Sequence, residues 1–137
     1  MMLVVLDTNI VVSSLLFRGT ASAVHKAWVE GRIELLFSRD MLAEYRQVLS
    51  YSKFKLSRDE VEYLMEEEIV PFGHEVEVQD SGTSWIPEDS DDDRFVEAAI
   101  QGKADALVSG DDHILSRCKN LPCKVMTLAE LLELLGV

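Results

Sequence analysis

The sequence predicts an α/β protein with three layers, in which helices cover both faces of a central parallel sheet of about five strands. Two observations support this prediction. Short apolar runs alternate with amphipathic stretches along all 137 residues, and several of the runs are continuously apolar, as in strands that are buried on both faces. Parallel strands need crossover connections, and the intervening helices provide them.

Five apolar runs have the length and composition of strands, and they span residues 4–6, 33–37, 76–78, 106–109 and 124–126. Five amphipathic stretches carry an apolar stripe at helical spacing, at about 21–30, 39–51, 58–70, 91–101 and 128–135. The expected order is β-α-β-α-α-β-α-β-α-β-α. This order leaves the helix between the last two strands without an assigned range.

Signals for helix ends support these ranges. Ser38 and Ser90 precede two of the stretches, at positions where an N-cap is expected. Two capping boxes begin other stretches, with the pairs Ser57/Glu60 and Thr127/Glu130. Glycines that can end a helix follow four stretches, at Gly31, Gly73, Gly102 and Gly136.

The length of the chain suits one domain over residues 1–137, with enough surface for a hydrophobic core. The segment 80–89 contains a glycine and a proline and is expected to be a loop, too short to separate two domains. The apolar N-terminus lacks a basic leader, and no apolar run approaches the roughly 18 residues that a membrane span needs. We therefore expect a soluble, cytoplasmic protein with no membrane segment.

The charge balance is unusually acidic, with 13 Lys and Arg against 25 Asp and Glu and a formal net charge of -12. Such a surface repels polyanions, which argues against a protein that holds nucleic acid by a broad basic face. Any chemistry on nucleic acid must therefore be local and assisted by cations.

Two aspartates follow predicted strands directly. Asp7 comes after the run 3–6, and Asp111 comes after the segment 106–110. In open α/β sheets, ligands bind beyond the carboxyl ends of the strands. Because parallel strands end on the same edge of the sheet, we expect these two carboxylates to lie at one edge.

Helical geometry adds two more carboxylates to this edge. Glu44 lies on the margin of the apolar stripe of the 39–51 helix, so its side chain can reach along the boundary of the core. In the next acidic helix, Asp92 faces the sheet, whereas Asp93 shares the outer face with Glu97. Taken singly, each of these acids also fits a structural role, as a turn residue, a charge at a helix N-terminus or a solvated surface group.

The joint pattern points to a metal site. Carboxylates gathered at one edge would repel by roughly 4 kcal/mol per close pair at an effective dielectric near 20, unless protons or cations offset the charge. Ligands that offer only oxygen suit Mg²⁺ or Mn²⁺. Such a site can support metal-assisted hydrolysis of a phosphodiester.

Four segments together resemble a PIN domain, and in particular the small VapC-like toxin components of toxin-antitoxin pairs. They are the Asp7-Thr8-Asn9 motif, Glu44 within a helix, the acidic run 89–97, and the motif that ends in Ser109-Gly110-Asp111. The resemblance covers essentially the whole chain. It implies a three-layer PIN-like fold and a Mg²⁺- or Mn²⁺-dependent endoribonuclease that acts on single-stranded RNA.

The resemblance also implies roles for individual residues. The four acids match the family's catalytic and metal-binding positions and are Asp7, Glu44, Asp92 and Asp111. Asn9 matches a polar residue that supports the first aspartate, Ser109 matches a Thr or Ser before the last motif, and Thr8 belongs to the first motif. The sequence departs from the family at His113, where relatives often have an acid. Imidazole is a poor Mg²⁺ ligand, so we expect His113 behind the ligands or on the surface.

The implied partners are a second copy of the chain and an antitoxin that would block the acidic cleft, presenting Arg to the carboxylates. Among the cations of the chain itself, Arg18 and Arg94 are expected to lie near enough to contact substrate phosphates.

Other enzyme classes have less support. A phosphatase of the haloacid-dehalogenase kind needs an aspartate where Asn9 stands, and the motifs G-x-S-x-G and G-x-x-x-x-G-K-[ST] do not occur. The main alternative is a catalytically idle PIN-fold module that binds RNA or protein. The presence of all four acids favours the enzyme.

Overall fold

Five parallel strands form one sheet in the computed structural model, which describes residues 2–87, 89–118 and 120–137. The strand order is β3-β2-β1-β4-β5. The strands are β1 (Met2–Leu6), β2 (Ile33–Phe37), β3 (Gly73–Glu75), β4 (Ala106–Val108) and β5 (Lys124–Met126). β1 is central, and its Val4 pairs with Leu35 on one side and with Ala106 on the other.

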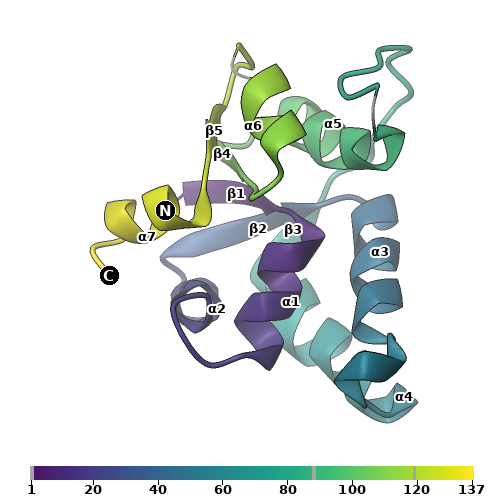
Figure 1. Ribbon diagram of the computed structural model, residues 1–137, viewed down its shortest axis with the longest axis vertical. Coiled ribbons are helices and arrows are strands. Elements are labelled where there is room, and N and C mark those ends of the chain that lie inside the picture. Colours follow the sequence, from purple (N-terminus) through teal and green to yellow (C-terminus); the bar gives the residue numbers. More distant parts are fainter. Residues whose placement is uncertain (1, 88, 119) are drawn as a thin grey trace.

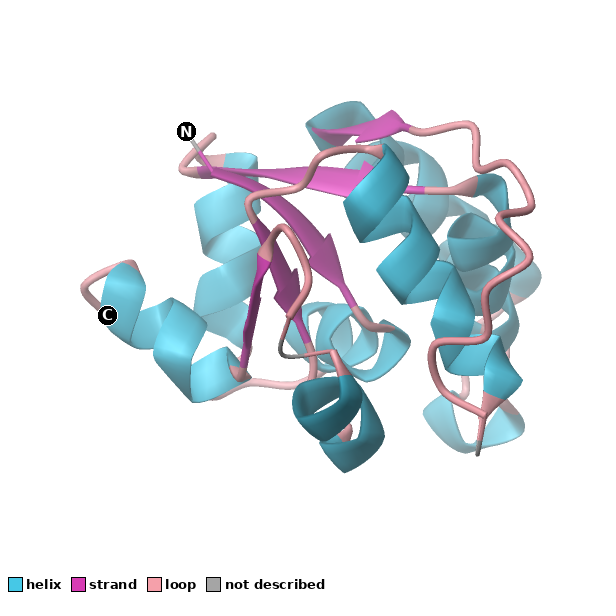
Figure 2. Ribbon diagram, turned by 90° about the horizontal axis from the view of Figure 1, so that it is seen from above, coloured by secondary structure: helices cyan, strands magenta, loops and turns pink. Residues whose placement is uncertain are grey.

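Helices flank the sheet on both sides, as predicted. They are α1 (Thr8–Leu16), α2 (Ser22–Val29), α3 (Arg39–Leu49), α4 (Arg58–Tyr63), α5 (Asp93–Gln101), α6 (Asp112–Arg117) and α7 (Leu128–Leu134). The connection from β1 to β2 and the connection from β3 to β4 run across the sheet in opposite directions, so right-handed crossovers place their helices on opposite faces. Figures 1 and 2 show this arrangement, with α1 and α2 on one side and α5 and α6 on the other. In the described part of the chain, no helix combines the length and the apolar character needed to span a bilayer.

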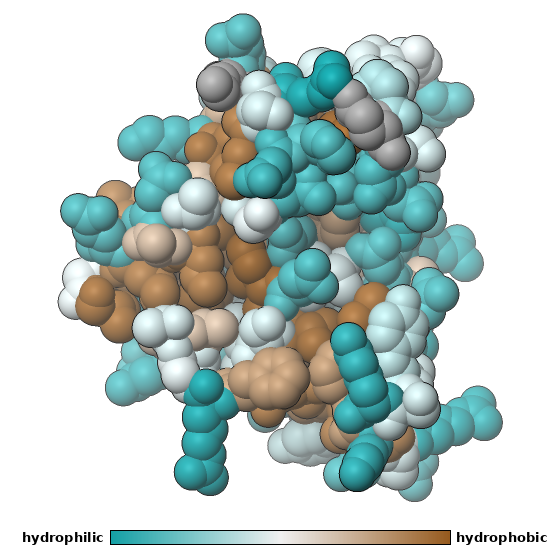
Figure 3. All heavy atoms as spheres, in the orientation of Figure 1, coloured by the Kyte–Doolittle hydropathy of each residue, from teal (hydrophilic) through white to brown (hydrophobic). Residues whose placement is uncertain are grey.

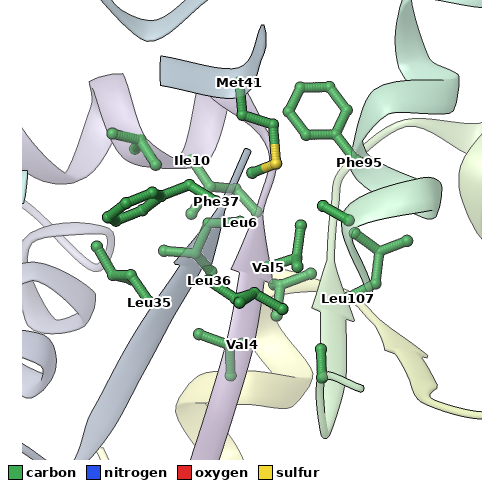
Figure 4. Close-up of a cluster of buried hydrophobic side chains, with 14 of the residues drawn as sticks. Val4, Val5, Leu6, Ile10, Leu35, Leu36, Phe37, Met41, Phe95 and Leu107 are labelled. Atoms are coloured by element: carbon green, nitrogen blue, oxygen red, sulfur yellow. The ribbon is translucent and has the colours of Figure 1, made fainter. Parts of the chain in front are cut away.

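The core lies on both faces of the two central strands. Val4, Val5 and Leu6 of β1 are almost completely buried. Figure 4 shows Met41 of α3 and Phe95 of α5 pointing toward one another beyond these strands. The core therefore fixes α3 and α5 against the sheet. Helix α3 carries the predicted site residue Glu44, and α5 begins directly after Asp92.

The third strand lies earlier in the chain than predicted. Strand β3 is formed by residues 73–75 and not by 76–78, although the valines of the predicted segment are half-buried. Pairing stops because the partner strand β2 ends at Phe37, where Ser38 caps α3. Gly73 lies against Leu35 so closely that a Cβ atom would be 2.4 Å from its carbonyl oxygen, which favours glycine at this register.

Helix α1 was not predicted, because the run that follows Asp7 is rich in β-branched residues and looks like a continuation of the strand. It forms because Asp7 caps it, with Oδ1 accepting a hydrogen bond from the backbone N–H of Ile10 at 2.9 Å. Helix α6 supplies the connection between β4 and β5 for which the sequence offered no range.

The predicted caps are correct at Ser38 and in both capping boxes. The predicted cap at Ser90 is wrong, because a 3₁₀ turn at Ser90–Asp92 precedes α5 and Asp89 caps that turn. The predicted 58–70 helix is also divided, since α4 continues into a π-helical segment at Leu64–Ile69.

Candidate functional site

The carboxyl ends of β1 and β4 each lead into a helix through an aspartate. Asp7 caps α1, and Asp111 caps α6 by accepting hydrogen bonds from the backbone N–H groups of His113 and Ile114 at 2.8 and 3.2 Å. Leu6 pairs with Val108 in the sheet, so the two aspartates follow neighbouring strand ends. The strand-end expectation for this pair therefore agrees with the structure.

Asp7 is held rigidly by three donors. Its Oδ2 accepts hydrogen bonds from the Ser109 hydroxyl at 2.6 Å and from the Gly110 N–H at 3.2 Å, in addition to the N–H of Ile10 on Oδ1. The Ser109 hydroxyl in turn accepts a hydrogen bond from the N–H of Asp111 at 3.0 Å. Burial raises the pKa of Asp7 above its ordinary value, while these hydrogen bonds oppose the shift without cancelling it.

Glu44 approaches the same edge from α3. The Thr8 hydroxyl donates a hydrogen bond to Oε2 of Glu44, and Nη1 of Arg94 lies 3.5 Å from Oε1. Both side chains of this ion pair are mostly buried, with 27% of Arg94 and 21% of Glu44 exposed. Glu44 therefore has partners for both of its carboxylate oxygens.

Asp92 differs from the other acids. Its Oδ2 atom is buried and, within the described residues, has no hydrogen-bond partner. Burial, followed by the negative charges of Asp89, Asp111, Glu44 and Asp7, raises the pKa of Asp92 from 3.8 to about 7. The structure thus brings the four predicted acids close enough for their charges to act on one another.

The donor set fits a hard divalent cation. All four acids offer oxygen, which Mg²⁺ and Mn²⁺ prefer. A cation beside Asp92 would satisfy this oxygen and offset the repulsion that, after burial, raises the pKa of Asp92. Across residues 2–87, 89–118 and 120–137, no three His, Cys, Asp or Glu side chains form a ready-made metal cage.

The remaining predicted residues are less closely gathered. Asn9 is exposed on the first turn of α1. Among the described residues, the hydrogen-bond donors to Asp7 are Ile10, Ser109 and Gly110, and Asn9 is not one of them. Arg18 is exposed beyond the far end of α1, a helix about 14 Å long that begins next to Asp7. His113 is half-exposed, with Nδ1 3.9 Å from Oδ1 of Asp111.

Two features of the site had no prediction from the sequence. The first is Tyr45, which is buried beneath the edge and donates a hydrogen bond to the carbonyl oxygen of Leu6 at 2.7 Å. Burial, with the nearby charges of Asp7 and Glu44, raises the pKa of this phenol, which keeps it a donor. A tyrosine inside the apolar stripe of a helix, next to a site acid, was the available signal.

The second feature is a loop that covers the outer face of α5. Glu97 accepts hydrogen bonds from the Ser81 hydroxyl, the Trp85 indole and the Gln101 amide at 2.6 to 2.7 Å. Asp93 accepts one from the N–H of Ile86 at 2.8 Å. Burial opposes the ionisation of Glu97, but its hydrogen bonds outweigh burial and hold its pKa below the ordinary value.

A polar pocket of about 380 Å³ lies beneath this loop, beside the acidic edge. Its walls include Ser38 and Asp40 at the start of α3 and Arg94 on α5. Of the residues around the acidic edge, Arg94 lines the pocket and also contacts Glu44. Figure 3 shows polar side chains gathered over α5 and α6, whereas hydrophobic side chains gather below and to the left, over α1 and α7.

The fold is similar to that of several solved structures. VapBC2 from Rickettsia felis, bound to a DNA fragment from its promoter, aligns with a TM-score of 0.60 and 16% identity, over 92% of this chain and 98% of that chain. PAE2754 from Pyrobaculum aerophilum aligns with a TM-score of 0.66 and 13% identity, over 98% and 90%. FitAcB from Neisseria gonorrhoeae aligns with a TM-score of 0.63 and 14% identity, over 92% and 98%.

No curated protein shows significant sequence similarity to the chain. A family model described as PIN domain matches residues 3–113, which include all four of the predicted acids. That match spans most of the sequence, and the VapC-type structures named above have the same fold as this chain. The chain therefore belongs to the PIN domain family.

Proposed function

We propose that this chain is a single-domain endoribonuclease over residues 1–137, which cleaves single-stranded RNA with Mg²⁺ or Mn²⁺ as its cofactor. PIN domains are generally nucleases, and the solved structure of the PIN domain endonuclease Utp24 has a similar fold, with a TM-score of 0.55. The observation that carries the proposal is the buried Oδ2 of Asp92, which has no hydrogen-bond partner among the described residues and lies within a group of four acids. A structural carboxylate would be expected to have a donor for that atom.

In this proposal Asp7, Glu44, Asp92 and Asp111 hold the cation. Held there, a cation would supply the chemistry of lowering the pKa of water for hydrolysis of a phosphodiester. Ser109 and the N–H of Gly110 fix the orientation of Asp7, and the Thr8 hydroxyl fixes that of Glu44. Asp92 must lose its proton before it can act as a ligand, so cation binding should weaken as the pH falls below about 7.

We also propose that the protein is the cytoplasmic toxin of a toxin-antitoxin pair, and that it forms a homodimer. Structural neighbours of VapC type support the toxin assignment. Because the net charge of -12 disfavours a large basic RNA-binding surface, binding of RNA should be weak without the metal.

Cleavage of end-labelled single-stranded RNA tests the activity. Wild-type protein should cut with Mg²⁺ or Mn²⁺ and not with a chelator, and it should spare double-stranded RNA and single-stranded DNA of the same sequence. Asp92→Asn should lose most of the activity, whereas Asp112→Asn, an exposed neighbour of the site with the same change of charge, should keep it. Equal cleavage by wild type and Asp92→Asn would show that the activity does not come from this site. Binding of Mn²⁺ without any cleavage would instead favour the idle module.

A further inference from the structure

Arg94 joins the two helices that bring acids to the edge. Its Nε donates to the carbonyl oxygen of Asp91 at 2.8 Å, and Nη2 lies 3.3 Å from the Asp91 carboxylate. Nη1 reaches across to α3, where the carbonyl oxygen of Asp40 and the carboxylate of Glu44 each lie 3.5 Å away. The guanidinium is therefore anchored on the 3₁₀ turn that precedes its own helix, and it reaches Glu44 with Nη1.

The two kinds of contact differ in strength. The Nε contact to Asp91 has the length of a good hydrogen bond, whereas both contacts of Nη1 are at the upper limit for one. Turning the outer nitrogens away from α3 would thus break no well-formed hydrogen bond there, and the ion pair with Glu44 would be exchanged for another anion. Arg94 also lines the 380 Å³ pocket, which gives the guanidinium room to do so.

The ion pair with Arg94 sets Glu44 apart from Asp92. Glu44 already has a cation beside Oε1, while Oδ2 of Asp92 has no partner among the described residues. A guanidinium binds phosphate oxygens as readily as it binds a carboxylate. A phosphate of a bound strand can therefore compete with Glu44 for Arg94.

We propose that Arg94 is an exchangeable counter-ion, which neutralises Glu44 in the free protein and passes to a phosphate of the bound strand, so that Glu44 becomes available to the divalent cation. This inference rests on the proposed function. It makes Arg94 a positioning residue and couples the binding of the strand to that of the metal.

The coupling can be measured without turnover. Mn²⁺ affinity is determined by electron paramagnetic resonance of the free ion, with and without a single-stranded 2′-O-methyl oligonucleotide that is checked for integrity on a gel. The proteins are wild type, Arg94→Gln, Glu44→Gln and the double variant. Arg46→Gln is the matched control, because Arg46 forms an exposed ion pair with Glu62 at 2.8 Å elsewhere on α3. Melting in the presence of chelator confirms that each variant is folded.

Removal of Arg94 should tighten Mn²⁺ binding about fivefold without the oligonucleotide, while Arg46→Gln leaves it unchanged. The oligonucleotide should tighten Mn²⁺ binding more in wild type than in Arg94→Gln. Loss of the Glu44 carboxylate should weaken Mn²⁺ binding at least about fivefold more in the Arg94→Gln background than in wild type, because only there is Glu44 already free.

Additive effects of the two substitutions would overturn the exchange, since a change of charge alone acts equally in both backgrounds. Equal tightening by the oligonucleotide in wild type and in Arg94→Gln would also overturn it. If wild type binds Mn²⁺ and cuts RNA but the substitutions are additive, only this inference fails. If wild type neither binds Mn²⁺ nor cuts RNA, the proposed function fails together with it.

Discussion

Asp92→Asn should stabilise the metal-free protein at neutral and alkaline pH. The folded state raises the pKa of Asp92 from 3.8 to about 7, so the protonated acid is favoured in the folded protein. Below about pH 4 the acid is protonated in both states and the substitution should be neutral. Between about pH 4 and 7 wild type loses stability, because Asp92 is then ionised in the unfolded chain but still protonated in the folded protein. Above pH 7 the difference in stability between wild type and Asp92→Asn should be constant.

The size of the effect follows from the same shift. Without screening by solvent, a rise of the pKa from 3.8 to about 7 would correspond to roughly 4 kcal/mol in the free energy of unfolding. Because Asp92 is only half-buried, solvent screening reduces this figure, and we expect Asp92→Asn to be more stable by about 1–2 kcal/mol at pH 8. Mn²⁺ at about one hundred times its dissociation constant would stabilise wild type by about 2.7 kcal/mol and should reverse the order.

Urea unfolding followed by circular dichroism measures both effects. The titrations are made at pH 5.5 and 8 with EDTA, and again at pH 8 with Mn²⁺, on wild type, Asp92→Asn and the control Asp112→Asn. A wild type that is more stable than Asp92→Asn at pH 8 in EDTA would refute the reasoning, because Oδ2 of Asp92 would then have a stabilising partner in the folded protein.

Three further substitutions test the surroundings of the site. Tyr45→Phe removes the buried donor to the carbonyl oxygen of Leu6 and should cost about 1–2 kcal/mol in urea unfolding, with Mn²⁺ affinity measured in parallel. Ser109→Ala removes the hydroxyl that links the first and last aspartates, and calorimetry should show Mn²⁺ binding about tenfold weaker. Glu97→Ala should release the loop that carries Trp85, seen as a red shift of tryptophan fluorescence and faster amide exchange in residues 79–87 while β1 is unchanged. In wild type the same red shift should appear only at a pH below the ordinary pKa of a glutamate, since the lowered pKa of Glu97 means that its hydrogen bonds weaken only when it is protonated.

The sheet could be predicted because burial on both faces leaves a strong mark in the sequence. β1, β2, β4 and β5 each overlap a predicted run, and the sheet is parallel as predicted. The third strand could not be placed, because pairing depends on where its neighbour ends. Val76 and Val78 alternate with exposed residues as a strand would, yet β2 has already ended at Phe37.

In the site, the positions of the acids could be predicted from the sequence, whereas a contact between two helices could not. Strand-end position and helical spacing brought Asp7, Glu44, Asp92 and Asp111 to one edge, because both follow from backbone geometry alone. The ion pair between Glu44 and Arg94 could not be predicted in this way. It joins helices that are 50 residues apart in sequence, and it depends on how far α3 and α5 approach one another.

The outer face of α5 shows why a helical wheel is incomplete by itself. The wheel correctly set Asp93 and Glu97 opposite the sheet, and solvent was the natural expectation for that face. In the structure, the loop that carries Trp85 and Ile86 covers this face, and its Ile86 is fully buried while its Trp85 is half-buried. Two large apolar residues in an otherwise polar loop need a surface to bury against, and a helix face with two acids offers acceptors for the backbone and indole N–H groups that are buried with them. Large apolar residues inside a predicted loop therefore indicate that the loop packs on a nearby helix face. That face can be a charged one, provided that its carboxylates can accept hydrogen bonds from the buried N–H groups of the loop.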